Sequence, residues 1–316
     1  MSRAPVVCIT HGGGPMPVLE PQMGGHGHDA LNESLRTRVR EILRLGTPEA
    51  PRAIVVVTPH WRPDHPTVTM VDEPPIYHDF EPSHPPAAFE IQYKAPGSSE
   101  VANLVHEALS AAGVSPAKDF ERGTVTISMH VPWVRARRLL VTADVAYWNK
   151  LAGLDHGVFI PFIFISPSGE VPLVSLSISN SSDPDLYTKM GQALAKLRDD
   201  NVAIVGSGFA SFHNVPMMRK LYMADPDSEE MTAWRNKVAD FNKGLVDGVL
   251  ADDPAQRARF LREWRALPHS YDLHPEDEDE HILPLFVAAG AADRSKGDWF
   301  ADMFGGVEVC TFYWSK

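Results

Sequence analysis

Three histidines each follow an apolar stretch that is typical of a buried β-strand. His11 ends the sequence VVCITH, His60 follows AIVVVTP, and His213 lies a few residues beyond VAIVGSG. The carboxyl ends of parallel strands share one edge of an open α/β sheet, and ligands bind at that edge. Structural histidines packed in a core would not favour one edge. The pattern therefore predicts a site where imidazoles from distant parts of the chain meet around a metal ion.

The glycines after His11 could serve as a phosphate-binding loop or as a hinge. A phosphate loop needs G-x-G-x-x-G spacing or a G-K-[ST] ending, and HGGGP has neither. Pro15 and Pro17 also interrupt any helix whose N-terminus would face an anion. We therefore expect a hinge that lets backbone or substrate pass close to a metal held by His11.

Other histidines lie in local patterns of different kinds. His156 stands in GLDHGVFIPF, directly before an apolar run that is expected to be a strand. His281 follows the acidic residues 276–280 and opens the apolar sequence HILPLFVAAGAA, which is expected to be a helix. A histidine at the start of a buried helix is well placed to be a fixed ligand. His26 and His28, in the glycine-rich sequence GGHGHD, are expected to be surface histidines.

The elements that must position these residues alternate between strands and helices. Strands are expected at 6–10, 53–58, 67–71, 159–165, 173–178, 202–206 and 307–314. Helices are expected at 31–45, 100–112, 184–198, 229–250 and 254–267. This order predicts a three-layer α/β/α sandwich, with a central mixed sheet and the metal site at the carboxyl edge of the strands. We expect one domain over residues 1–316, in which residues 115–150 are a possible insertion or lid.

Composition limits the classes of partner and compartment. The net charge of −12 disfavours nucleic acid and anionic membranes, because an acidic surface does not attract them. Cys8 and Cys310 both lie in strand-like apolar runs and are expected to be free buried thiols in a reducing compartment. We find neither a signal-peptide pattern nor a run of about 20 apolar residues, and we expect a cytoplasmic protein.

These stretches together resemble the class III extradiol ring-cleavage dioxygenases, in the branch that includes DOPA 4,5-dioxygenases. The matching sequences are THGGGPMPV, AIVVVTPHW, IYHDF, YKAPGS, GLDHGVFIPF, VSLSI, VGSGFASFHN and EHILPLFVAAGAA. They occur in the family's order from residue 6 to about residue 292, so the resemblance covers most of the chain.

The resemblance implies that His11, His60 and His281 are the metal ligands. The expected ion is Fe(II), and Zn²⁺ is possible in the same site. The acidic run before His281 leaves Glu280 open as the third ligand instead. Cleavage of a catechol by O2 needs a redox-active metal with several open positions, and a facial three-ligand Fe(II) site provides them.

The resemblance also implies roles around the metal. His213 matches the acid/base catalyst, which is sometimes counted as a fourth ligand, and His156 matches the histidine that faces the substrate. Imidazoles can accept the protons that a chelated catechol releases. The expected product is a muconic semialdehyde, and candidate substrates are DOPA, caffeate and protocatechuate. Candidate pocket residues are His78, Tyr93, Trp61 and Phe159, together with Phe80 as a wall.

A zinc-dependent hydrolase is the alternative that uses the same histidine cluster. Three imidazoles around Zn²⁺, with water in the fourth position, would activate that water for attack, and imidazole suits both metals. The expected partners are otherwise a catechol and O2, and a homodimer is the default oligomeric state.

Overall fold

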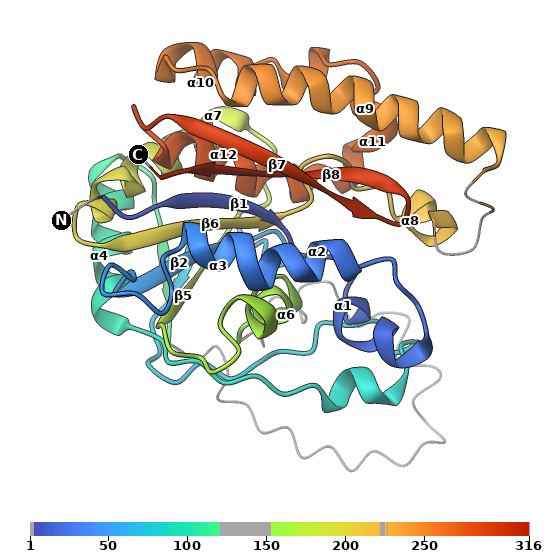
Figure 1. The fold of residues 1–316 in the computed structure, drawn as a ribbon. Helices are drawn as coiled ribbons and strands as arrows, with labels where there is room; N and C mark the ends of the chain where they lie inside the picture. The colour runs from blue at the N-terminus through green and yellow to red at the C-terminus, as the bar shows by residue number, and fades with distance from the viewer. Residues whose placement is uncertain (1–2, 121–152, 222–224, 226, 316) are drawn as a thin grey trace, which may run out of the picture.

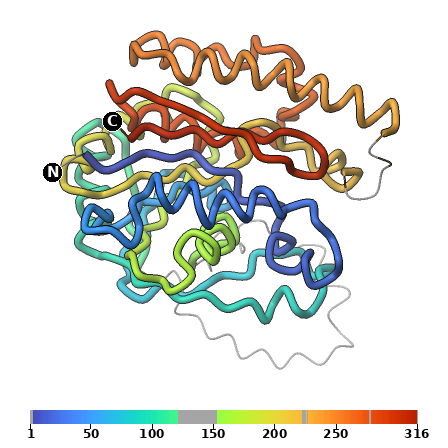
Figure 2. Tube along the Cα trace, in the orientation of Figure 1, coloured from blue at the N-terminus to red at the C-terminus, as the bar shows by residue number. Residues whose placement is uncertain are grey.

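The computed structural model describes residues 3–120, 153–221, 225 and 227–315. The strands in these residues form one mixed sheet in the order β4-β3-β5-β2-β6-β1-β8-β7 (Figure 1). The bounds are β1 Val6–Thr10, β2 Ala53–Thr58, β3 Thr67–Thr69, β4 Ala117–Asp119, β5 Leu173–Ser177, β6 Val202–Gly208, β7 Gly297–Phe304 and β8 Val307–Trp314. Strands β1, β6, β2 and β5 are parallel and central. The chain trace in Figure 2 shows β1 between β6 and the C-terminal strand β8, which pairs with it antiparallel.

Helices cover both faces of the sheet, and strand residues alternate between them. Val55 and Val57 pack with α4 (Ser99–Ala111), α7 (Pro184–Leu194), α9 (Glu229–Val249) and α12 (Leu283–Ala291). Ile54 and Val56 pack on the other side with α2 (Asp29–Ser34), its continuation to α3 (Arg40–Ile42), and α6 (His156–Ile165). Both faces are buried, so the central strands are apolar at every position. The predicted three-layer sandwich is confirmed.

Shorter elements complete the described chain. They are α1 (Met16–Leu19), η1 (Glu20–Met23), the π-helix η2 (Leu35–Val39), η3 (Pro86–Glu90), η5 (Ala195–Arg198), α8 (Val215–Leu221), α10 (Pro254–Arg262), η6 (Trp264–Ala266), α11 (Ser270–Leu273) and η7 (Glu276–Ile282). Of the predicted insertion, residues 117–119 form β4, which pairs with β3. Residues 121–152 lie outside the described residues.

The predicted strand at 159–165 is wrong, because these residues belong to helix α6. The helix is apolar all round, so its sequence carries no period that would distinguish it from a buried strand. Pro161 lacks the N–H that would bond the carbonyl of Gly157 four residues earlier. The hydroxyl of Ser207 donates to that carbonyl instead, so the helix continues through the proline. Strand β7 was not predicted, since residues 297–304 mix charged and aromatic side chains at the sheet edge.

Two further predictions bear on the chain as a whole. Cys8 and Cys310 are free and buried, as expected. Burial raises the pKa of the Cys310 thiol to about 12, so the thiol stays protonated at neutral pH. None of the helices in the described part of the chain is both long and apolar enough to cross a membrane. The single-domain assignment over residues 1–316 stays a prediction.

Candidate active site

Parallel strands bring the predicted ligands to one edge of the sheet. His11 directly follows β1 and His60 lies just beyond β2, while His281 stands in η7 immediately before α12. The ring centroid of His11 lies 4.9 Å from that of His60 and 5.3 Å from that of His281. The centroids of His60 and His281 are 5.0 Å apart. Three imidazoles from distant parts of the chain therefore meet at the carboxyl edge.

Nδ1 of His281 and Nδ1 of His60 each lie beside a carboxylate. Nδ1 of His281 lies 2.8 Å from Oε1 of Glu280, and a carboxylate can only accept, so this nitrogen carries the proton. Nδ1 of His60 lies 3.4 Å from Oδ1 of Asp155 and 3.5 Å from Oδ2 of Asp79. The proton on Nδ1 leaves Nε2 of His281 bare, whereas Nδ1 of His60 accepts from the backbone N–H of Gly157, at 3.2 Å. The Nε2 atoms of His60 and His281 face each other. These two nitrogens lie only 2.9 Å apart.

His11 is oriented in the same way by a strand residue beside it. Its Nδ1 lies 3.2 Å from Oγ of Ser207, on the neighbouring strand β6. The Ser207 hydroxyl already donates to the carbonyl of Gly157, so His11 must donate to Ser207. Nε2 of His11 is therefore also free of a proton. Metal-binding histidines usually have such a partner on the ring nitrogen that does not bind the metal, and this partner fixes the tautomer.

These residues fit a metal ion. The Nε2 atoms of His60 and His281 lie 2.9 Å apart, close enough for both to bind one ion. Two imidazole nitrogens about 2.1 Å from one ion, at a right angle, lie about 3 Å apart. Among the described residues, three groups of side chains could each hold an ion: His11–His60–His156, His213–Glu280–His281 and His60–Asp79–Asp155. The predicted triad spans the first two groups, and the close approach of His60 to His281 joins them.

Burial controls the charge of these rings. Burial is the largest influence on His11 and His281, and with the neighbouring imidazoles it lowers their pKa well below the usual value. Burial is also the largest single influence on His60. There the hydrogen bond to Asp155 and the charge of Asp79 outweigh it and raise the pKa. Two of the three rings are therefore strongly held in the neutral form that binds metals.

The two predicted proton-transfer residues stack on two of these rings. His156 begins α6, its ring stacks on His60 with centroids 3.8 Å apart, and its Nδ1 lies 2.9 Å from Oδ2 of Asp79. His213 stacks on His281 with centroids 3.5 Å apart. Burial, the largest influence on both, lowers the pKa of His156 and His213, although nearby carboxylates act in the opposite direction.

A cavity of about 330 Å³ opens onto the histidines. His11, His156, His213 and His281 line one part of it. The remaining lining comprises Gly12–Gly14, Met16, Asp79, Phe80, Glu81, His84, Phe209, Val215, Met218 and Arg219. The wall is mainly apolar and the imidazoles converge on it, so an aromatic molecule with polar substituents fits its chemistry.

Comparison with known proteins identifies the family of this chain. The family described as the catalytic LigB subunit of aromatic ring-opening dioxygenase matches residues 5–307. The chain belongs to the LigB family. It is therefore an oxidoreductase, an aromatic ring-opening dioxygenase, and the zinc hydrolase alternative loses its support.

Named relatives of this LigB dioxygenase cover most of its length. It is 35% identical to dioxygenase tasH of Hapsidospora irregularis over 99% of this chain and 86% of that protein. It is 29% identical to the 4,5-DOPA dioxygenase extradiol of Beta vulgaris, over 81% of this chain and 79% of that one. The crystal structure of uncharacterized protein JW3007 from Escherichia coli K12 superposes with a TM-score of 0.63, at 23% identity, over 98% of this chain and 99% of that one. That last likeness concerns the fold alone.

The four pocket residues predicted for the LigB dioxygenase are not among those that line the cavity. His78 bonds through Nε2 to the carbonyl of Ile91, at 2.8 Å, and its ring contacts Phe159. The hydroxyl of Tyr93 donates to a backbone carbonyl, that of Ser166, at 3.0 Å. Trp61 and Phe159 are buried in the interior. Among the residues expected as walls, only Phe80 lines the cavity.

Sequence reasoning missed the carboxylates that surround the histidines. Asp79 accepts hydrogen bonds from the backbone N–H of His156, at 2.9 Å, and lies against its ring nitrogen. Asp155 accepts from the hydroxyl of Thr58, at 2.7 Å, and lies beside His60. Both stand in the quoted sequences IYHDF and GLDHG, directly beside histidines. That adjacency is the signal that could have identified them.

Glu280 was left open as an alternative ligand, and His28 was expected at the surface. Glu280 contacts the protonated nitrogen of His281, on the side away from His60, and lies 3.6 Å from a guanidinium nitrogen of Arg62. This position favours His281 over Glu280 as a ligand. The side chain of His28 is instead fully buried against Glu20.

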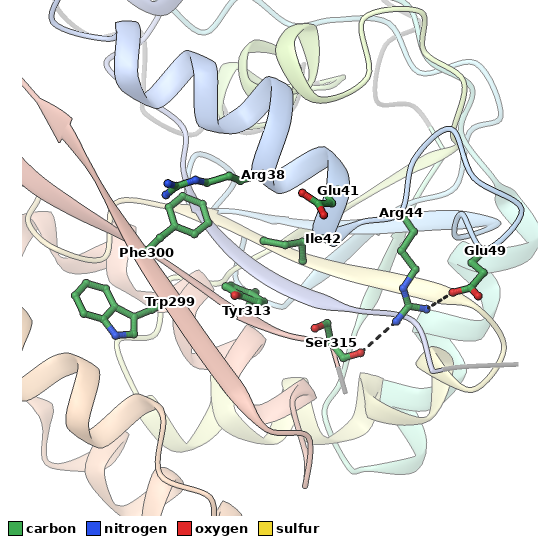
Figure 3. Close-up of a pocket in the computed structure, with 9 residues that line it drawn as sticks. All are labelled: Arg38, Glu41, Ile42, Arg44, Glu49, Trp299, Phe300, Tyr313 and Ser315. Atoms are coloured by element: carbon green, nitrogen blue, oxygen red, sulfur yellow. Dashed lines mark hydrogen bonds and ion pairs between the residues drawn. The ribbon is translucent and has the colours of Figure 1, made fainter.

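A second, larger cavity has no cluster of histidines among the described residues that line it. It measures about 740 Å³ and lies between the η2–α3 segment and strands β7 and β8 (Figure 3). Its lining residues are Arg38, Glu41, Ile42, Arg44, Glu49, Trp299, Phe300, Tyr313 and Ser315, none of them a histidine. Arg44 already pairs with Glu49 and with the carbonyl of Ser315. Size alone therefore does not identify the active site of this protein.

Proposed function

We propose that this LigB dioxygenase binds Fe(II) through His11, His60 and His281 and uses O2 for extradiol cleavage of a catechol to a muconic semialdehyde. The observation that carries the proposal is the 2.9 Å approach of the two Nε2 atoms of His60 and His281, with each Nδ1 beside a carboxylate. Bound Fe(II) would supply open positions for the catechol oxygens and O2.

His213 and His156 move protons in this proposal. Nδ1 of His213 lies 3.3 Å from the carbonyl of Glu278, which can only accept, so Nε2 of His213 is the basic nitrogen. Asp79 likewise holds the Nδ1 proton of His156. Both rings line the cavity and their pKa values are lowered by burial, so both are neutral bases at pH 7 that can accept a catechol proton.

The substrate is a substituted catechol such as DOPA, caffeate or protocatechuate. Phe80, Phe209, Met16 and Met218 give the cavity apolar walls suited to an aromatic ring. Several relatives bear the name 4,5-DOPA dioxygenase extradiol, which supports DOPA as the first compound to test.

The test is oxygen uptake by metal-free protein loaded anaerobically with either Fe(II) or Zn(II). We expect the Fe(II) form alone to consume O2 with one catechol of the panel, in step with a new visible product absorbance. Absorbance without O2 uptake, or equal turnover with Zn(II), would overturn the proposal. His60→Ala, loaded in the same way, is the matched negative control.

Oligomeric state and location complete the proposal. We infer a homodimer, which sedimentation equilibrium tests directly, and a cytoplasmic location, which cell fractionation tests. A monomer across the micromolar range would contradict the first inference.

A further inference from the structure

The glycine loop beside His11 is held in place by a buried histidine that the reaction itself does not use. The backbone N–H of Gly13 donates to Nε2 of His28, at 3.1 Å. An N–H group can only donate, so Nε2 of His28 is bare and its proton lies on Nδ1. That nitrogen faces Oε2 of Glu20 at 2.5 Å. Glu20 therefore selects the tautomer of His28 that can accept from the loop.

Both members of this pair are enclosed by the chain. The side chain of His28 is fully buried and that of Glu20 is 9% exposed. A Cβ added at Gly27 would lie 2.9 Å from Oε1 of Glu20, so the backbone wraps closely around the carboxylate. The ring of His28 also packs edge-on against Phe304, with centroids 4.9 Å apart. Within the sequence GGHGHD, His28 is thus a buried, hydrogen-bonded histidine, whereas His26 is exposed.

The held loop forms part of the substrate cavity. Gly12, Gly13 and Gly14 line it next to His11. Gly12 has a φ of +83°, and a Cβ there would lie 3.1 Å from the ring of His28, so only glycine fits. Three successive glycines have little intrinsic rigidity. The N–H of Gly13 is fixed by His28, and its carbonyl accepts from the N–H of Met16, at 3.1 Å, so His28 supplies the side-chain contact that holds this wall.

We propose that His28, held in one tautomer by Glu20, is a positioning residue that fixes the Gly12–Gly14 loop and so sets the shape of the catechol site. The kinetic part of this inference rests on the proposed function. The loop that His28 holds lines the cavity, so we expect its effect to fall on substrate binding more than on the chemical step.

Two variants of His28 separate positioning from packing. His28→Gln keeps an acceptor for Gly13 and a donor for Glu20, whereas His28→Leu keeps the bulk and loses both. We expect His28→Leu to raise KM for the catechol by about three- to tenfold, the range set by one lost hydrogen bond, with a smaller change in kcat. His28→Gln should restore KM to within about twofold. His26→Leu is the matched control, because His26 lies two residues away and is 79% exposed.

Two measurements on metal-free protein do not depend on the reaction. Side-chain ¹⁵N NMR should show His28 with its proton on Nδ1, and amide exchange at Gly13 should be faster in His28→Leu than in the wild type or His28→Gln. A proton on Nε2, or unchanged Gly13 exchange in a folded His28→Leu, would overturn the inference even if dioxygenase activity is found. If both hold while no catechol is cleaved, the proposed function fails and the loop assignment stands. Equal KM for the Leu and Gln variants would overturn the kinetic role.

Discussion

The imidazole of His213 lies face to face against that of His281, with centroids 3.5 Å apart and planes 12° apart. His156 and His60 form a second stack, at 3.8 Å and 27°. Each stack joins a proposed metal ligand to a proposed proton-transfer residue. A substitution in either ring can therefore disturb its neighbour, so each variant has to be judged by metal content as well as by rate.

The neighbours Glu280 and His281 are distinguished by iron binding. We expect His281→Ala to lose stoichiometric Fe(II), because it removes the nitrogen that faces His60. Glu280→Gln should retain iron with affinity lowered by at most about 100-fold, since its amide oxygen still accepts from Nδ1 of His281. Metal analysis after anaerobic gel filtration measures both. Glu276→Gln, exposed in the same acidic run, is the control, and iron lost only in the Glu280 variant would make Glu280 the ligand.

His213→Gln should slow turnover without releasing iron. Loss of a general acid/base lowers kcat by about 10²- to 10⁴-fold. The variant keeps a polar side chain against Glu278 and His281, so the Fe(II) content should match that of the wild type. Stopped-flow O2 consumption and iron analysis test this together. His65→Gln, at an exposed position, should match the wild type in both, whereas iron loss in His213→Gln would assign that ring to the metal instead.

We expect the negative charge of Asp79 to orient the ring of His156. Burial is the largest influence on Asp79 and would raise its pKa, but His156 and His60 outweigh it and lower the pKa to about 2. Asp79→Asn keeps the size and removes the charge, so kcat/KM should fall by about 10- to 100-fold. Steady-state kinetics at saturating iron measure the loss. Asp64→Asn, at the surface, is the control, and an unchanged pH profile in Asp79→Asn would contradict a role in orienting His156.

Acid should remove a stabilising contribution from Glu170. Burial alone would raise its pKa, but hydrogen bonds from Ser168, Ser166 and Arg40 outweigh burial and lower the pKa from 4.5 to about 2. A depressed carboxyl pKa stabilises the fold above about pH 4.5, and the contribution disappears as the pH falls toward 2. Glu170→Gln should cost about 1 kcal/mol in the free energy of unfolding at pH 7.

Urea unfolding at pH 7 and pH 3 tests the Glu170 prediction. The difference between wild type and Glu170→Gln should shrink at the lower pH. Glu263→Gln, whose carboxylate is 58% exposed in a surface pair, should change stability by no more than about 0.5 kcal/mol. A difference for Glu170→Gln that grows on acidification would have the wrong sign.

The sequence by itself determined the central strands and the histidines that follow them. VVCIT and AIVVVT are continuous apolar runs, and a strand buried on both faces requires that pattern wherever it lies in the sheet. His11 and His60 were therefore placed correctly at the carboxyl edge. The strand predicted at residues 159–165 was wrong, because an apolar run with no polar face fits a buried helix and a buried strand equally well.

Only the tertiary structure decided which groups face the histidines. Ser207 meets His11 across 196 residues of chain because β1 and β6 pair in parallel at that register. The burial of His28 likewise depends on Glu20 and Phe304, which are brought to it by a turn and by the β7–β8 hairpin. A sequence pattern records which residues are apolar, but hydrogen-bond partners, tautomers and cavity walls depend on neighbours that folding alone brings within a few ångströms.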